Sequence, residues 1–297
     1  LLAEHFRLEG KTSRALAELQ AAQERGWPEV QVARARLLIR ARKEFAQVEP
    51  DLQALLDVNP DDPAVLQALS LGWLRARSFS RAEKLINTLL VHHPDDGAAL
   101  YIRGRIFLQS LRPHQARPDL EKAFQLGTDR YYAYDARASL GDCLLELGQF
   151  EEAEQRYREC LAEQPGDVDV RFGLGRCAWY LNRWDEAADA FRAVLRQRPD
   201  HVQALSQLAY IHEERGELPE ALELLERAVR HQPGWYDLHF RMAKILQAQG
   251  RTKQAAEHRA LAEKMKQHWA KPRSEHSPDQ DLYTGVRRSS LRGSTGR

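Results

Sequence analysis

The stretch LGDCLLELGQFEEAEQRYRECLAEQP, residues 140–165, contains two short amphipathic segments that are separated by Gly148. Apolar residues recur every three or four positions in each segment, which is the spacing of a helix with one buried face. Gly141 and Ala153 place a small side chain in each segment, so two antiparallel helices can approach closely. Pro165 ends the second segment, because proline lacks the backbone donor and clashes with the preceding turn. The stretch therefore predicts a helical hairpin.

The same proline recurs along the chain, at Pro60, Pro94, Pro165, Pro199 and Pro233. Three of the four gaps between successive prolines are 34 residues long, and the remaining gap of 71 residues equals two periods and a three-residue insertion. A fixed period of about 20–50 residues is typical of solenoid proteins, in which one helical unit stacks on the next.

Two columns of small side chains keep the same period. The column in the first helix of each repeat holds Ser70, Gly104, Gly141, Gly175, Ala209 and Ala243. The column in the second helix holds Ala82, Ala116, Ala153, Ala187, Ala221 and Ala255. Four residues later a larger apolar residue follows, in the order Ile86, Leu120, Tyr157, Phe191 and Leu225, whereas the last repeat has Arg259. We expect both small columns to be buried where paired helices cross.

These residues resemble the tetratricopeptide repeat (TPR) family, whose pattern runs W-x2-L-G-x2-Y, then A-x3-F, then P. The stretch 140–165 matches it best, with Gly141, Ala153, Tyr157 and Pro165 in place. The resemblance covers residues 1–269 and implies an all-α fold, a right-handed solenoid of tandem helix-turn-helix repeats.

The register predicts the organisation of the chain. We expect a truncated repeat at 1–28, a weak repeat at 29–62, and repeats at 63–96, 97–130, 134–167, 168–201, 202–235 and 236–269. In the weak repeat, Arg36 and Val48 replace the small residues. The insertion at 131–133 should lengthen one helix by almost a turn. The tail, 270–297, is rich in Ser, Gly and Arg and carries six basic and three acidic residues. Its composition predicts a disordered basic segment.

The sequence leaves the cellular compartment of the protein undecided. The chain begins at Leu1, in what we interpret as the middle of a repeat, so a signal peptide, an anchor or a further domain upstream remains an alternative. The sequence has no run of about 18 or more apolar residues, so we expect no transmembrane span. A cytoplasmic location is favoured, with a membrane-anchored or periplasmic location as the alternative.

Catalytic motifs are missing from the sequence. It contains no phosphate-binding loop, no nucleophile elbow and no zinc-ligand spacing, so we expect no catalytic residue, no metal and no cofactor. Cys143, Cys160 and Cys177 lack a C-x2-C pairing. We interpret them as free buried thiols, with a disulfide or redox pair as the alternative.

The resemblance implies that first helices line a concave groove that binds proteins. The groove candidates are Tyr101, Arg105, Asp142, Phe172, Arg176, Trp179, Tyr180, Tyr210, Glu213, Phe240 and Lys244. Phe172, Arg176 and Trp179 share one helical face, and we expect them near Tyr210 and Glu213. The Lys/Asn set with which cochaperone TPR domains hold a terminal carboxylate is missing.

The functional prediction is a non-catalytic protein-interaction scaffold that binds a peptide or a helix of a partner protein. Two alternatives stay open: a recruitment or regulatory segment of a larger enzyme, such as a glycosyltransferase or kinase, and an assembly factor for a bacterial envelope or secretion complex. We expect no specific nucleic-acid partner, and the oligomeric state is open.

Overall fold

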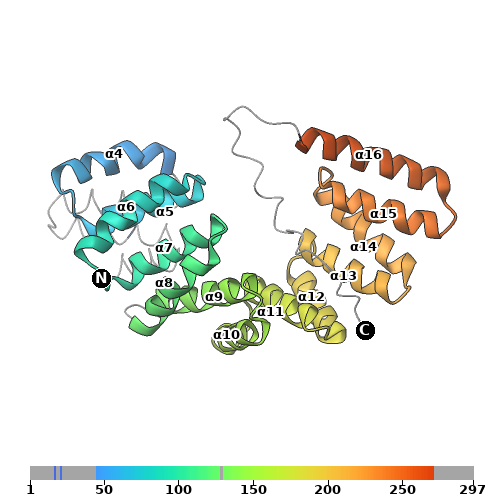
Figure 1. Cartoon of the computed structure of the whole chain (residues 1–297), viewed down its shortest axis with the longest axis horizontal. Helices are drawn as coiled ribbons and strands as arrows, with labels where there is room; N and C mark the ends of the chain where they lie inside the picture. Colours follow the sequence, from blue (N-terminus) through green and yellow to red (C-terminus); the bar gives the residue numbers. More distant parts are fainter. Residues whose placement is uncertain (1–16, 18–20, 22–44, 128–129, 271–297) are drawn as a thin grey trace, which may run out of the picture. The chain divides into compact units, whose positions relative to one another are not determined.

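The computed structural model describes residues 45–127 and 130–270, together with Ala17 and Ala21. Apart from Ala17 and Ala21, the expected repeat at 1–28 lies outside the described residues, as do residues 29–44 of the repeat expected at 29–62 and the basic tail after residue 270. Within the described ranges all regular structure is α-helical, which confirms the all-α prediction (Figure 1).

The helices follow one another through short turns. They are α4 (Phe45–Val58), α5 (Pro63–Arg75), α6 (Phe79–His92), α7 (Gly97–Gln109), α8 (Pro113–Leu126), α9 (Arg130–Glu146), α10 (Phe150–Glu163), α11 (Val168–Tyr180), α12 (Trp184–Gln197), α13 (Val202–Glu214), α14 (Leu218–His231), α15 (Tyr236–Ala248) and α16 (Thr252–Ala270).

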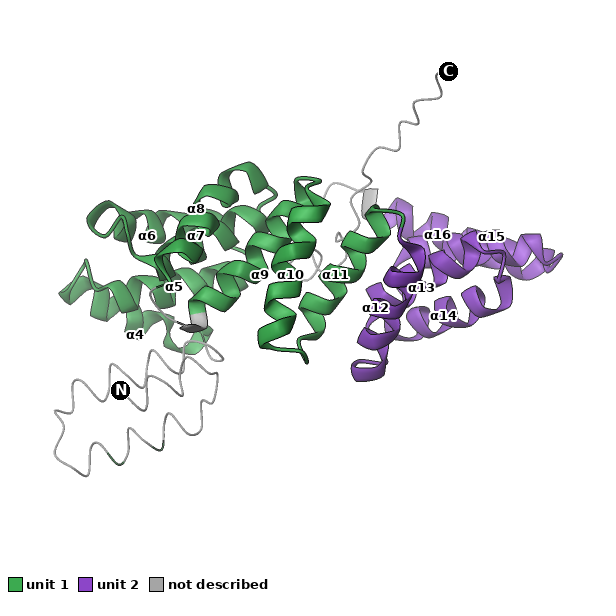
Figure 2. Ribbon diagram, turned by 90° about the horizontal axis from the view of Figure 1, so that it is seen from below, with its two compact units in different colours: residues 1–182 green, residues 183–297 purple. Residues whose placement is uncertain are grey.

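The chain divides into two compact units, Leu1–Asn182 and Arg183–Arg297 (Figure 2). The first unit holds α4 to α11 and the second holds α12 to α16. The sequence predicted one continuous array and gave no sign of this division, which falls inside the repeat expected at 168–201.

The periodic prolines lie just past the second helices. For example, α6 ends at His92, two residues before Pro94, and α14 ends at His231, two residues before Pro233. Proline cannot continue a helix, so these positions set the ends of the hairpins.

Side chains after these prolines cap the next first helix. Asp62 Oδ1 accepts from the backbone N of Ala64 at 3.1 Å, and Asp167 Oδ1 accepts from Val170 N at 3.0 Å. An N-cap carboxylate satisfies amides that the first turn of a helix leaves unpaired. At α13 the cap is His201 rather than the aspartate before it.

The two small columns are buried, as predicted. The second-helix alanines, Ala82, Ala116, Ala153, Ala187, Ala221 and Ala255, are all 0% exposed. A Cβ placed on Gly104 would lie 2.6 Å from Leu120 Cγ, and one on Gly141 would lie 2.7 Å from Tyr157 Cε1. The larger column fills the space opposite, whereas Arg259 is exposed.

The insertion at 131–133 lengthens α9. This helix has 17 residues, whereas α7 and α11 have 13 each. The prediction of almost one extra turn is confirmed.

Each turn between the two helices of a repeat holds one left-handed residue at the same register. Three are glycines with ordinary freedom at positive φ: Gly148 (78°), Gly216 (75°) and Gly250 (75°). The other three are Arg77 (57°), Leu111 (63°) and Asn182 (60°). Asparagine tolerates this conformation better than leucine or arginine, so Arg77 and Leu111 carry backbone strain.

The three cysteines are free and buried, which confirms that interpretation. Burial raises the pKa of the Cys143 thiol to about 12 and that of Cys160 to about 11. None of the described helices is long and apolar enough to cross a membrane.

The substitutions Ala187→Leu and Ala221→Leu should each lower the free energy of unfolding by about 1–3 kcal/mol, because both alanines are completely buried and a larger side chain overpacks their surroundings. Thermal unfolding measures the effect. Ala256→Leu is the control, since Ala256 is exposed on α16 and should tolerate the change. Unchanged melting temperatures for both buried variants would show that the helix register is wrong.

Leu111→Gly should stabilise the protein by about 0.5–1 kcal/mol. The substitution removes about 1–2 kcal/mol of strain from the left-handed backbone conformation. This gain exceeds the free-energy cost of the extra conformational entropy that glycine gives the unfolded chain. Leu111 is 57% exposed, so little packing is lost. Chemical denaturation tests this, with Gly216→Leu as the reverse change, expected to destabilise. A destabilised Leu111→Gly variant would contradict the strain argument.

All three thiols should resist a maleimide at neutral pH in the native protein and react within minutes in denaturant. The reactive species is the thiolate, and burial both hides it and disfavours its formation. Mass spectrometry counts the modified cysteines. Rapid native labelling at any of the three positions would contradict their burial.

Candidate functional site

The first helices of unit 1 lie next to one another. Helix α7 contacts both α5 and α9, and α9 also contacts α11. In Figure 1, α10 lies below α9 and α11, against which it packs. We call the exposed and half-buried side chains of α5, α7, α9 and α11 the first-helix face of unit 1.

Arg105 is held on this face by a tyrosine beneath it. Arg105 Nη1 donates to Tyr101 Oη at 2.7 Å, and Tyr101 Oη donates to Asp135 Oδ2 at 3.4 Å. Tyr101 is only 3% exposed, and its ring lies 5.6 Å from that of Tyr132. Tyr101, a groove candidate from the sequence, is therefore a buried support, and Arg105 is the group that reaches the face.

Asp142 is tied to the core through Tyr157. Tyr157 Oη donates to Asp142 Oδ1 at 2.7 Å, while the Tyr157 ring packs against the backbone of Gly141 and Gly173. Asp142 is exposed, yet the packed helices around it displace much of its water, which raises its pKa. Burial also raises the pKa of Tyr157. One core residue thus fills the helix crossing and orients a carboxylate on the face.

Arg176 is paired with the preceding repeat. Its Nη2 donates to Glu146 Oε1 at 3.1 Å, and its side chain is 23% exposed. Burial opposes the charge, but neighbouring anionic groups led by Glu146 outweigh it and raise the pKa of Arg176. This arginine is therefore held in a defined direction while part of its guanidinium stays accessible.

The aromatic candidates on α11 differ from one another. Tyr180 stacks on Phe150 of α10, with ring centroids 4.6 Å apart, so it packs at the edge between two helices. Trp179 meets Tyr180 edge to face at 4.8 Å. Phe172 and Trp179 are half-buried. Packing inside unit 1 therefore accounts for much of the area of Tyr180.

A second group of candidates lies in unit 2, on α13 and α15. Glu213 is the centre of this group, and its side chain is 9% exposed. It accepts from Lys244 Nζ at 2.6 Å and from Arg241 Nη2 at 3.3 Å. One carboxylate thus holds two cations in place.

Arg241 was absent from the sequence-based candidates. Its Nη1 donates to the Ser206 carbonyl at 2.9 Å, and its guanidinium lies 5.6 Å from the Tyr210 ring centroid. Burial lowers the pKa of Arg241. Its place directly after Phe240, on a helix already expected in the groove, was the one signal that pointed to it.

Phe240 and Lys244 are the accessible members of this second group. Phe240 is 53% exposed as a residue, and the side chain of Lys244 is 68% exposed. They are four residues apart on α15, so they lie on one side of the helix. We call Phe240 and Lys244, with the supporting Tyr210, Glu213 and Arg241, the α15 patch. Phe172, Arg176 and Trp179 belong to unit 1 and this patch belongs to unit 2.

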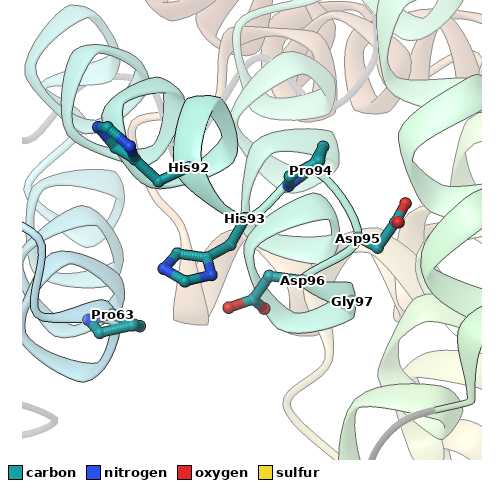
Figure 3. Close-up of a pocket in the computed structure, with 7 residues that line it drawn as sticks. All are labelled: Pro63, His92, His93, Pro94, Asp95, Asp96 and Gly97. Atoms are coloured by element: carbon teal, nitrogen blue, oxygen red, sulfur yellow. The ribbon is translucent and has the colours of Figure 1, made fainter.

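An open cavity of about 480 Å³ lies in unit 1, at the loop between α6 and α7 (Figure 3). Asp96 in its wall caps α7 and accepts from Gln67 Nε2 at 3.0 Å, and His92 Nε2 lies 3.6 Å from Asp61 Oδ1. The polar groups of this loop therefore hold the repeats together. Among the residues that the structure describes, no three His, Cys, Asp or Glu side chains converge as metal ligands.

Solved structures with the same fold are distant in sequence. The chain is similar to the APC/C hetero-tetramer Cut9–Hcn1, with 16% identity, a TM-score of 0.71, and coverage of 86% of this chain and 50% of that one. A tetratricopeptide repeat protein from Parabacteroides merdae has 19% identity, a TM-score of 0.58, and coverage of 84% and 93%. MamA from Desulfovibrio magneticus has 19% identity, a TM-score of 0.51, and coverage of 59% and 98%. At these identities the likeness shows the fold alone, a helical repeat solenoid.

No curated protein matches the chain significantly in sequence. A family model described as Tetratricopeptide repeat matches it at residues 67–123, 107–168, 144–191 and 172–237, which together exceed half of the chain. The chain therefore belongs to the tetratricopeptide repeat family, and its repeats support a role as a protein-interaction scaffold.

Proposed function

We propose that this chain binds a peptide or a helix of a partner protein on its first helices, without catalysis. The observation that carries the proposal is the row Arg105, Asp142 and Arg176, contributed by α7, α9 and α11. Each of these residues directly follows the small residue of its helix, so the three lie on equivalent sides of their helices.

The row is oriented before any ligand arrives. Each charged group has a partner: Tyr101 for Arg105, Tyr157 for Asp142 and Glu146 for Arg176. Side chains that are already ordered lose less conformational entropy on binding. This order favours recognition of a specific ligand over a loose electrostatic attraction.

The charges along the row alternate between positive, negative and positive. Guanidinium groups donate to backbone carbonyls and carboxylates, whereas the Asp142 carboxylate accepts from amides and cationic side chains. Phe172 lies one helical turn before Arg176 and adds apolar area. Arginine beside aromatic area is typical of the residues that dominate protein interfaces. A peptide with apolar and polar groups in alternation fits this chemistry.

The α15 patch supports a second, smaller contact. Phe240 exposes an aromatic ring and Lys244 exposes an amine on the same side of α15. Glu213 holds the amine, so the patch offers an apolar anchor beside a positioned donor.

The proposal is tested with peptides selected on the whole chain from a displayed random library. Affinity for the best peptide is then measured by fluorescence anisotropy. The double variant Arg105→Ala and Arg176→Ala should bind more than about tenfold more weakly, a loss of about 1.4 kcal/mol. Its circular dichroism should match that of the wild type, because both side chains lie outside the core.

The matched control is Glu151→Ala with Glu152→Ala, two exposed residues in the first turn of α10, a second helix. This variant should bind as the wild type does. Full binding by the arginine variant together with loss of binding by the α10 variant would place the ligand on the second helices and overturn the proposal.

A further inference from the structure

We infer that a histidine pair between α15 and α16 makes this hairpin of unit 2 sensitive to acid. His239 Nδ1 and His258 Nδ1 are 2.9 Å apart, and the two rings stack with centroids at 5.2 Å and planes 26° apart. His239 is 5% exposed and His258 is half-buried. The pair therefore lies inside the contact between the two helices.

The neighbours of the pair determine where its protons are. His239 Nε2 lies 3.0 Å from the Pro233 carbonyl oxygen, which only accepts, so Nε2 carries the hydrogen. Neutral His239 then has a lone pair on Nδ1, and His258 donates to it from its own Nδ1. This arrangement satisfies both facing nitrogens with a single proton between them.

Acid disrupts the arrangement in two steps. A first proton goes to His258 Nε2, which keeps the bond but places a charge in a partly buried site. Any second proton taken up between the two facing Nδ1 atoms turns two N–H groups toward each other at 2.9 Å and brings two positive charges together. The hairpin must open to accommodate this state.

The charged groups around the pair do not reverse its preference for the neutral state. Glu226 of α14 and Glu257 of α16 favour protonation of His258, but burial outweighs them, with a further electrostatic contribution from the His239 ring, and lowers the pKa of His258. A histidine whose pKa is below the unfolded value of about 6.5 stabilises the fold above that pH. The stabilisation is lost as the pH falls from about 6.5 through the pKa of the folded state.

Two other hairpins of the chain place leucines at the matching positions. One repeat earlier, α13–α14 has Leu205, which is 0% exposed, and the half-buried Leu224. The hairpin α5–α6 has Leu66 and Leu85. The contact therefore accepts an apolar pair in the same backbone, and the two histidines add a dependence on pH to it.

A local response is consistent with the architecture, since a repeat contacts only its neighbours and hairpins can open separately. Helix α15 also carries the α15 patch, with Phe240 directly after His239. If the proposed function holds, acid weakens binding at that patch. The acid sensitivity itself does not depend on any ligand.

The first experiment follows the histidine side chains of the whole wild-type chain by NMR between pH 8 and 5. His258 should titrate below about 6.5, and the amides of α15 and α16 should lose protection from hydrogen exchange as the pH falls. A His258 that titrates at or above this value, with both helices still protected, would overturn the inference.

The second experiment compares melting temperatures at pH 7.5 and 5.5. The wild type should melt at a lower temperature at pH 5.5 than at pH 7.5. In the double variant His239→Leu and His258→Leu this decrease should be less than half as large. The control is His268→Leu, which replaces an exposed histidine on α16 and should show the same decrease as the wild type. Equal losses for wild type and double variant would refute the inference. Neither experiment uses a ligand, so failure here leaves the proposed function standing.

Discussion

The close approach of paired helices at their small residues is the constraint on which the rest of this structure depends. Six alanines of the second helices are completely buried, and at Gly104 and Gly141 even a methyl group would collide with the facing side chain. The separation of the helices is thus set by side-chain size. Because the crossing repeats, the larger residue opposite it, the turn and the terminating proline repeat with it.

This packing also prepares the candidate site. The second helices cover one side of each first helix and leave another side for Arg105, Asp142 and Arg176. Tyr157 shows how core and face are connected, since its ring fills the crossing at Gly141 and its hydroxyl holds Asp142. The charged row is therefore positioned by the same contacts that stabilise the repeats.

Positions outside the small columns differ from repeat to repeat, and these differences give single hairpins properties that the other hairpins lack. At one register within the hairpins, Leu205 and Leu224 in α13–α14 are replaced by His239 and His258 in α15–α16. The neighbouring Arg259 points to solvent where other repeats bury a large apolar residue. The small residues at the helix crossing hold the two helices together in each repeat. The side chains of a neighbouring contact can therefore change from apolar to ionisable without loss of the hairpin.

The sequence by itself determined the helices, their ends, the buried columns and the longer α9, because each follows from a pattern within a few turns of one helix or from the fixed period. It did not reveal the division at Asn182, the burial of Tyr101 or the part played by Arg241. Those features depend on which side chains meet between helices, as in the pairs Tyr101–Asp135 and Arg241–Ser206, which are 34 and 35 residues apart. Only the tertiary structure brings such residues together, because the spacing along one helix says which side a residue occupies and not which neighbour it meets.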